Sequence, residues 1–211
     1  MFLSKLQLRS TEAIFKDIYD AHQALWDLFS DRSDRERDFL FREIDSVTYL
    51  TVSAREPVDR QGVWRMSIKP YAPKLAAGDR LYVSLRANAV IKRKGPDGRQ
   101  IRFDVVQDAR KPYKDRGENP PSRVALAQRE GVKWLLARQE AMGLCFEDQS
   151  LVVERYVVYN YWRGGRKVTL GALDFAGFAE VSDPNKARDK LLAGVGPAKG
   201  FGCGLLLARR A

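Results

Sequence analysis

A histidine and a tyrosine lie three residues apart near the start of the chain, and both side chains can take part in proton transfer. His22 is the chain's one histidine, and Tyr19 precedes it by three residues. On a helix, positions i and i+3 share a face, so the two side chains would point the same way. An imidazole with an ordinary pKa near about 6.5 donates or accepts a proton at neutral pH. A lone helical histidine is more often structural, so the pair by itself leaves both interpretations open.

The second candidate for chemistry is a glycine-rich stretch, Gly194-Val-Gly-Pro-Ala-Lys-Gly-Phe-Gly-Cys-Gly-Leu-Leu206. Its glycines are Gly194, Gly196, Gly200, Gly202 and Gly204. Glycine permits positive φ and close backbone approach, and successive N–H groups of such a loop can bind an anion, with Lys199 adding a cation. Lys199 is followed by glycine rather than Ser or Thr, which excludes a P-loop. A strand is expected after the loop, which excludes a dinucleotide fingerprint. The alternative is a tight helix-to-strand turn without a ligand.

The charge is distributed unevenly along the chain. Residues 1–60 hold nine Lys and Arg against twelve Asp and Glu, a net of −3, whereas the whole chain carries +10, so the remainder carries +13. A basic excess confined to one part of a chain indicates a surface that binds a polyanion. The alternative is a protein that is basic without such a partner.

Composition favours a globular protein of the cytoplasm. The chain of 211 residues is 45% hydrophobic, and no apolar run approaches the roughly 20 residues that cross a bilayer. The first residues lack a signal-peptide layout, so we expect no membrane partner. Cys145 and Cys203 form neither a disulfide framework nor a metal cluster, and their apolar neighbours predict two reduced core residues.

The pair Tyr19 and His22 requires a helix, and the sequence predicts one from about residue 10 to residue 29. Ser10 or Thr11 would cap it. One face carries an apolar stripe that consists of Ile14, Ile18, Ala21, Leu25 and Phe29. The neighbouring face carries Phe15, Tyr19, His22 and Trp26. We therefore expect this helix to pack on a sheet and also to border a cleft.

The remaining elements alternate between strands and helices. In the first half we expect strands at 2–8, 47–54, 63–68 and 81–88, a short helical piece around 39–41, and a reduced second helix around 72–77. In the second half we expect a strand at 101–106, a loop at 108–122, a helix at 124–142, a hairpin of 151–161 with 167–181, a helix from Asp183-Pro184 to about 192, and a last strand at 205–208. The order strand, helix, strand, strand, helix, strand predicts an α+β fold of tandem ferredoxin-like (RRM-like) domains at 1–92 and 100–211.

Several of these segments together resemble one family. The glycine-rich tail, Ser4-Lys5-Leu6, Tyr19-Asp-Ala-His22 and Leu85-Arg-Ala-Asn88 are similar to the CRISPR repeat-RNA endoribonucleases of the CasE family, type I-E. The resemblance runs in order from residue 1 to residue 211. It implies two facing ferredoxin-like domains, cleavage of the CRISPR precursor RNA at each repeat hairpin without a metal or cofactor, and retention of the product within the Cascade complex with its other subunits.

The resemblance also implies roles for residues. His22 and Tyr19 match the family's catalytic positions. The RNA's own 2′-hydroxyl would attack the scissile phosphate, which needs proton transfer and charge stabilisation but no metal. Which of the two residues is acid and which is base stays open. Asp34, Asp38 and Asp45 are interpreted as surface residues rather than metal ligands.

RNA binding is expected from the basic second half. A hairpin tip with Arg163, Arg166 and Lys167, and Arg155 lower on its strand, would contact the phosphates of an RNA stem. Further candidates are Arg86, Lys92, Arg93, Lys94 and Lys199. Each charge has a solvated surface residue as its alternative. Tyr156, Tyr159 and Tyr161 either stack on bases or belong to the core.

Two other functions compete with the endoribonuclease. One is a non-catalytic RNA-binding module or subunit of a ribonucleoprotein, although the chain has no RRM-type aromatic string. The other is a structural subunit that binds RNA only within an assembly. Cleavage of a hairpin RNA in EDTA separates the first from an enzyme, and RNA binding by the isolated protein would argue against the second.

Overall fold

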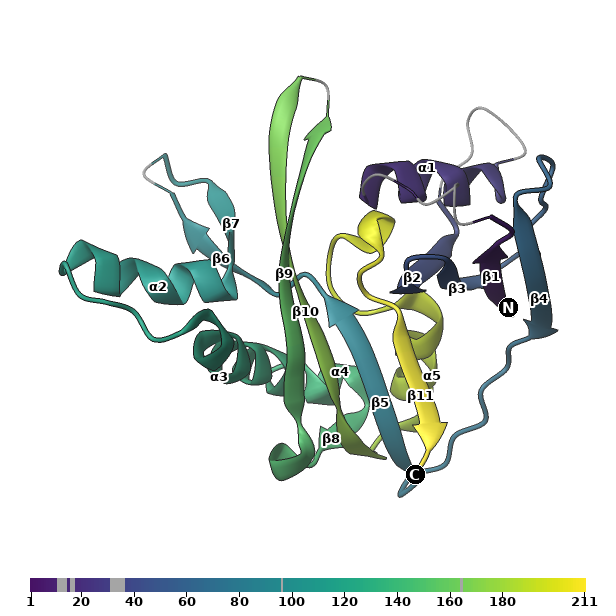
Figure 1. The fold of residues 1–211 in the computed structure, drawn as a ribbon. Coiled ribbons are helices and arrows are strands. Elements are labelled where there is room, and N and C mark those ends of the chain that lie inside the picture. The colour runs from purple at the N-terminus through teal and green to yellow at the C-terminus, as the bar shows by residue number, and fades with distance from the viewer. Residues whose placement is uncertain (11–14, 16–17, 31–36, 96, 164) are drawn as a thin grey trace.

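The computed structural model describes residues 1–10, 15, 18–30, 37–95, 97–163 and 165–211. Two antiparallel sheets lie side by side, and a basic arm extends from the second (Figure 1). The strands of the first half are β1 (Phe2–Leu8), β2 (Phe39–Asp45), β3 (Thr48–Ser53) and β4 (Trp64–Pro70), with the helix α1 (Ile18–Asp27). The first sheet has the order β2-β3-β1-β4 and every neighbouring pair is antiparallel. This is the ferredoxin-like order without the second helix.

The second sheet contains the later strands. They are β5 (Arg80–Ala87), β8 (Leu144–Phe146), β9 (Val152–Arg163), β10 (Arg166–Val181) and β11 (Leu206–Arg210). β5 lies between β10 and β11, and β10 also pairs with β9 and, near its end, with β8. The helices are α2 (Val105–Asp115), α3 (Arg123–Leu136), α4 (Gln139–Met142) and α5 (Pro184–Ala193), with 3-10 turns η2 (Asp148–Ser150) and η3 (Lys199–Phe201). The order β9-β10-β5-β11 repeats the first sheet, so the tandem ferredoxin-like fold is confirmed.

The boundary between the two units differs from the expected one. β5 was placed with residues 1–92, but it pairs with β10 and β11 of the second sheet. The sheets therefore part between β4 and β5, in residues 71–79, where Pro73 interrupts regular structure. The expected boundary at 92–100 falls inside a hairpin of β6 (Val90–Lys94) and β7 (Gln100–Asp104).

Five local expectations were also wrong. Residues 39–41 form part of strand β2, because Phe39 and Phe41 pack toward α1 while Leu40 packs toward the second unit. Residues 72–77 form no helix. The expected loop at 108–122 begins as helix α2, which Asp104 caps by accepting bonds from the N–H groups of residues 106 and 107. The expected helix 124–142 is divided into α3 and α4. The strand expected at 101–106, as the first of the second unit, is instead part of β7 up to Asp104 and the start of α2 after it, and β5 takes that role.

The remaining elements follow their sequence signals. Helix α5 begins where Asp183 accepts hydrogen bonds from the N–H groups of Asn185 and Lys186, and it ends at Gly194 with φ 77°. Ala21 and Leu25 bury the expected apolar face of α1 against β1, β2 and β4, although Ile14 lies outside the described residues. Cys203 is buried as expected, whereas Cys145 is exposed on β8. Cys145 is exposed because alternate residues of β8 face away from the core.

The seam between the units is both apolar and charged. Leu40 and Val52 of the first sheet form one buried cluster with Leu205 of the glycine-rich stretch. Beside it, Arg86 of β5 forms ion pairs with Asp174 and Glu43, the second of which lies on β2. Contacts of both kinds fix α1 relative to the glycine-rich loop, which is the geometry that the site needs.

Candidate active site at the seam of the two units

His22 points from α1 into an aromatic cluster at the seam. Its ring centroid lies 5.8 Å from that of Phe201 in η3 and 6.4 Å from that of Phe41 on β2. Tyr19, one turn earlier, has its ring centroid 6.4 Å from that of His22. Both side chains are partly buried. The helix therefore presents Tyr19 and His22 together, as the spacing predicted, and it presents them to the second unit.

The glycine-rich loop approaches His22 because two of its positions lack side chains. A Cβ atom on Gly200 would lie 2.9 Å from Arg37 Nη1 and 3.7 Å from His22 Cε1. A Cβ atom on Gly202 would lie 3.2 Å from Phe41 Cε2, and Gly202 also has φ 71°. Positive φ recurs at Gly194, Gly196 and Gly204, so the loop's path favours glycine at four positions, whereas at Gly200 the missing side chain leaves room for the Arg37 guanidinium.

Lys199 lies in the turn that carries Gly200. Its Nζ donates a hydrogen bond of 2.6 Å to the carbonyl oxygen of Ala193, at the end of α5. Burial lowers the pKa of Lys199, and the positive charges of Arg37 and Lys190 lower it further. Lys199 therefore belongs to a local concentration of positive charge beside His22.

The hairpin β9–β10 reaches the same cluster near its outer end. The Tyr161 ring centroid lies 4.9 Å from that of Phe201 and 6.4 Å from that of Tyr19, with nearly parallel planes in the second case. Tyr161 is 5% exposed, so it packs as a core residue between hairpin, helix and loop. Tyr156 and Tyr159 are partly buried, and Tyr156 donates a hydrogen bond to Asp104.

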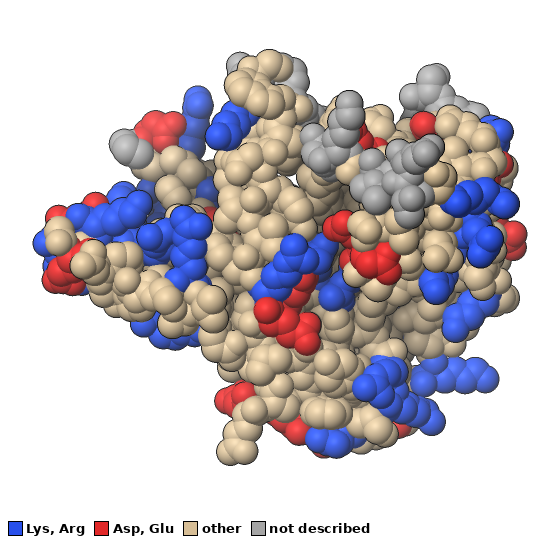
Figure 2. Space-filling view, viewed as in Figure 1, with Lys and Arg blue, Asp and Glu red and all other residues tan. Residues whose placement is uncertain are grey.

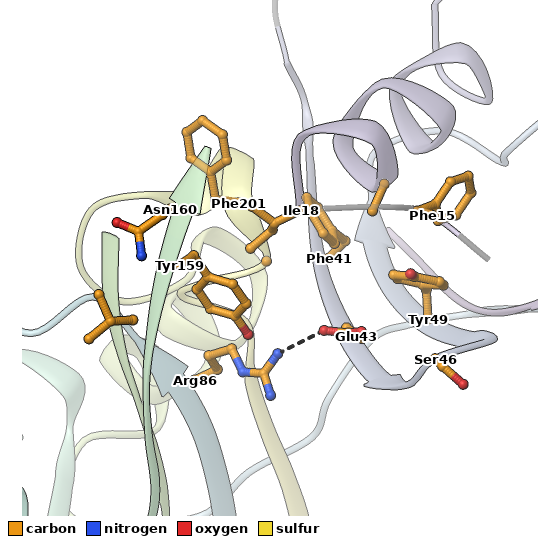
Figure 3. Close-up of a pocket in the computed structure, with 13 residues that line it drawn as sticks. Phe15, Ile18, Phe41, Glu43, Ser46, Tyr49, Arg86, Tyr159, Asn160 and Phe201 are labelled. Atoms are coloured by element: carbon orange, nitrogen blue, oxygen red, sulfur yellow. Dashed lines mark hydrogen bonds and ion pairs between the residues drawn. The ribbon is translucent and has the colours of Figure 1, made fainter. Parts of the chain in front are cut away.

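A cleft of about 370 Å³ opens between the units next to this cluster (Figure 3). Figure 3 shows Tyr159 and Phe201 on the side of the second unit and Phe41 and Tyr49 on the side of the first. The ion pair of Arg86 with Glu43 crosses between the two sides. Helix α1 borders this cleft as expected, but it does so through Ile18 and Ala21 of the stripe that was expected to pack on the sheet, together with the preceding Phe15.

Arg86 lies in this seam rather than on the outer surface. Its side chain is 7% exposed, and its Nε and Nη2 donate to the two carboxylate oxygens of Asp174 at 2.7 and 3.0 Å. Burial alone would lower the pKa of Arg86, but the hydrogen bonds and charge of Asp174 raise it above the ordinary value. The contacts of Arg86 are those of a residue that holds the units together, so we do not carry it into the proposed RNA surface.

The other basic candidates lie on two projections of the second unit. Lys92, Arg93 and Lys94 are exposed on β6, and Arg93 is bound to Asp108 through two hydrogen bonds. Figure 2 shows Lys and Arg gathered over this arm, which β6, β7 and α2 form. The second projection is the hairpin β9–β10, on which Arg155 and Lys167 are exposed.

At the tip of the hairpin, Arg163 and Arg166 pair with each other in register, and their side chains lie outside the described part of the structure. Sequence reasoning missed their neighbour Trp162, which is 69% exposed opposite Lys167. It also missed Phe201 and Arg37 at His22. An aromatic residue beside a Gly-Gly turn could have indicated Trp162, whereas the other two depend on tertiary packing.

The carboxylates that were interpreted as surface residues have ordinary partners. Asp38 pairs with Arg55 at 2.9 Å, and Asp45 accepts a bond from the N–H of Val47, while Asp34 lies outside the described residues. Within the described ranges, no three His, Cys, Asp or Glu side chains gather as metal ligands would. None of the helices in those ranges is both long and apolar enough to cross a membrane.

Comparison with known proteins shows which family this chain belongs to. A family model described as CRISPR associated protein matches residues 1–210. The chain belongs to this family. It is 31% identical, over 98% of each chain, to the CRISPR system Cascade subunit CasE of Escherichia coli K12, which confirms the expected CasE relationship.

Two further comparisons agree in sequence and in fold. The CRISPR-associated endoribonuclease Cse3 of Thermus thermophilus is 27% identical over 98% of each chain. A solved structure of Thermus thermophilus Cse3, bound to an RNA that represents a pre-cleavage complex, superposes with a TM-score of 0.71 at 25% identity, covering 99% of this chain and 98% of that one.

Proposed function

We propose that this protein is a metal-independent endoribonuclease that cleaves CRISPR precursor RNA at the repeat hairpin and stays bound to the mature guide RNA as a Cascade subunit. The names of two relatives support the activity and the assembly, since one is a Cascade subunit and the other an endoribonuclease. The observation that carries the proposal is the position of His22, which faces the glycine-rich loop together with Tyr19.

The reaction uses groups that the RNA and this site supply. The 2′-oxygen of the nucleotide before the scissile phosphate attacks phosphorus, and the bond between phosphorus and the 5′-oxygen breaks. One proton leaves the 2′-hydroxyl and one is added to the 5′-oxygen, so the products are a 2′,3′-cyclic phosphate and a 5′-hydroxyl. An imidazole transfers protons at neutral pH, and a phenol positions the nucleophile or a phosphate oxygen through a hydrogen bond.

The two projections of the second unit would hold the RNA. The exposed residues Lys167 and Arg155 lie along the hairpin, with Arg163 and Arg166 at its tip, and Lys92 and Lys94 lie along the arm. Duplex RNA is recognised mostly through its backbone and shape, to which such cations are suited. Lys199 precedes Gly200, the residue that faces His22, and would add a positive charge near the scissile phosphate.

The test is a substrate with one 2′-deoxy nucleotide immediately before the scissile phosphate. We expect the protein to bind this RNA as tightly as the all-ribose hairpin and to leave it uncut, because the nucleophile is missing. The all-ribose hairpin should be cut at the same rate in EDTA and in Mg²⁺, with ends that analyse as cyclic phosphate and 5′-hydroxyl. Cleavage of the deoxy substrate, or a strict need for Mg²⁺, contradicts the mechanism. Binding without cleavage of either RNA leaves a non-catalytic RNA-binding subunit.

A further inference from the structure

Arg37 is a partly buried cation that has no acidic partner among the described residues. It lies two residues before β2, and burial lowers its pKa. Among the described residues no carboxylate lies within ion-pair distance of its guanidinium, because Asp38 pairs with Arg55 instead. A desolvated positive charge without a counter-charge costs free energy, and such a site is suited to an anion from outside the protein.

The guanidinium of Arg37 lies beside His22. Both side chains border the position that a Cβ atom of Gly200 would take, at 2.9 Å for Arg37 Nη1 and 3.7 Å for His22 Cε1. The sum of these two distances is therefore an upper limit on the separation of the two atoms. A phosphate oxygen hydrogen-bonded to Arg37 would then lie within reach of the imidazole.

Lys199 places a second cation at the same location. The charge of Arg37 is among the causes that lower the pKa of Lys199, so the two charges repel each other. Both residues line a surface depression of about 270 Å³ between β2 and the end of α5, which Asp38 also lines while its carboxylate is paired with Arg55. Two neighbouring cations in one depression favour an anion that carries more than one oxygen, as a phosphodiester does.

We propose that Arg37 is a further catalytic residue, whose guanidinium binds the non-bridging oxygens of the scissile phosphate beside His22, with Lys199 as the second cation. This inference rests on the proposed function. While the bond from the 2′-oxygen forms and the bond to the 5′-oxygen breaks, negative charge accumulates on those non-bridging oxygens. A positioned guanidinium stabilises this charge more than it stabilises the bound substrate, and this difference accelerates the reaction.

The first experiment compares Arg37→Ala and Arg37→Lys with the wild type. Single-turnover cleavage measures the rate, and binding of the uncleavable 2′-deoxy hairpin measures affinity. Removal of one donor to a developing oxyanion typically costs about 10²–10³-fold in rate, and Arg37 is partly solvated, so we expect a loss of at least about tenfold for Arg37→Ala. We expect a smaller loss for Arg37→Lys and a much smaller change in affinity for both. Arg65→Ala, which removes an exposed charge from the distant edge strand β4, is the matched control and should change neither quantity.

Gly200→Ala provides a second, independent variant. The backbone of Gly200 is not in the positive-φ region, so alanine is tolerated there, but its Cβ would displace the Arg37 guanidinium. We expect Gly200→Ala to slow cleavage in the wild type and to have little further effect in Arg37→Ala, because the displaced group is already absent. Guanidinium chloride, far below denaturing concentrations, should partly restore cleavage by Arg37→Ala.

The outcomes separate this inference from the proposed function. If the wild type cuts, His22→Ala does not, and Arg37→Ala cuts at the wild-type rate, then only the role of Arg37 is wrong. Equal losses of rate and affinity in Arg37→Ala, without rescue by guanidinium, would show a binding or structural role and also overturn it. If the wild type itself fails to cut, then the proposed function is wrong and the inference is wrong with it.

Discussion

The first sheet, β2-β3-β1-β4, and the second, β9-β10-β5-β11, have the same strand order but carry different additions. The first keeps one helix, and that helix bears Tyr19 and His22. The second keeps both helix positions and adds a long hairpin, a basic arm and the glycine-rich loop. Residues 1–60 carry a net charge of −3 and the remainder +13. The same scaffold thus occurs twice, once with the groups that we propose for proton transfer and once with the groups that we propose bind the RNA.

The largest expected effect tests whether the first unit carries the catalytic histidine. His22→Ala should reduce single-turnover cleavage by about 10²–10⁴-fold, the usual contribution of general acid–base catalysis. Binding of the hairpin RNA should change little, because the basic projections lie on the other unit. Gln23→Ala, an exposed neighbour on the same helix, is the control and should cleave normally. A near-normal rate for His22→Ala would remove the first unit from the chemistry.

The next effect tests whether the two units depend on each other. Arg86→Met leaves Asp174 buried without its partner, which should lower the free energy of unfolding by about 3–5 kcal/mol, measured in urea. Arg80 of the same strand is the control, since its ion pair with Glu147 is about half exposed.

Arg80 also lies over the Phe178 ring, but both of its contacts are solvent-exposed, so Arg80→Met should lower the free energy of unfolding much less than Arg86→Met does. Adding Asp174→Leu to Arg86→Met should recover much of the loss, because no buried charge is then left. Equal losses for Arg86→Met and Arg80→Met would show that the seam does not depend on the buried pair.

The smallest expected effect tests whether the second unit binds the RNA. Replacing Arg163, Arg166 and Lys167 together by Ala should weaken RNA binding and flatten its salt dependence by up to about 0.9 per lost phosphate contact. Cleavage at saturating protein should stay near the wild-type rate.

The matched control removes three exposed cations from the first unit, Lys5, Arg65 and Lys69, and should alter affinity less. If both triple variants weaken binding equally, then the net charge of the protein rather than the hairpin binds the RNA. The second unit would then have no special role in RNA binding.

Sequence reasoning identified what local pattern determines. The hairpin β9–β10 follows from alternation around Gly164-Gly165, and α5 follows from the cap Asp183 before Pro184. Strand β2 was missed because both of its faces are buried, so Phe39-Leu40-Phe41 shows no alternation. Helix α2 was missed because Pro112 lies inside it, although Asp104 before two valines was an available start signal.

The same distinction holds for the site. Tyr19 and His22 are close in sequence and the glycines are a compact motif, so both were found. That Arg37 lies beside Gly200 depends on how two distant segments pack, and no local pattern contains that information. The partners of β5 are equally non-local, since they follow it by about ninety and about 120 residues, and this is why the domain boundary was misplaced.

The pairing of β5 with β11 has a consequence for the order in which the protein is made. β5 is synthesised early, but β11 and the turn that faces His22 belong to the last residues of the described chain. A ribosome adds residues in sequence, so the first sheet can form long before the second is closed. Until residue 206 emerges, one edge of β5 has unpaired backbone groups, and the partners of His22 from η3 do not yet exist. A nascent chain therefore cannot assemble this site before residues 199–210 have been synthesised and have left the ribosome.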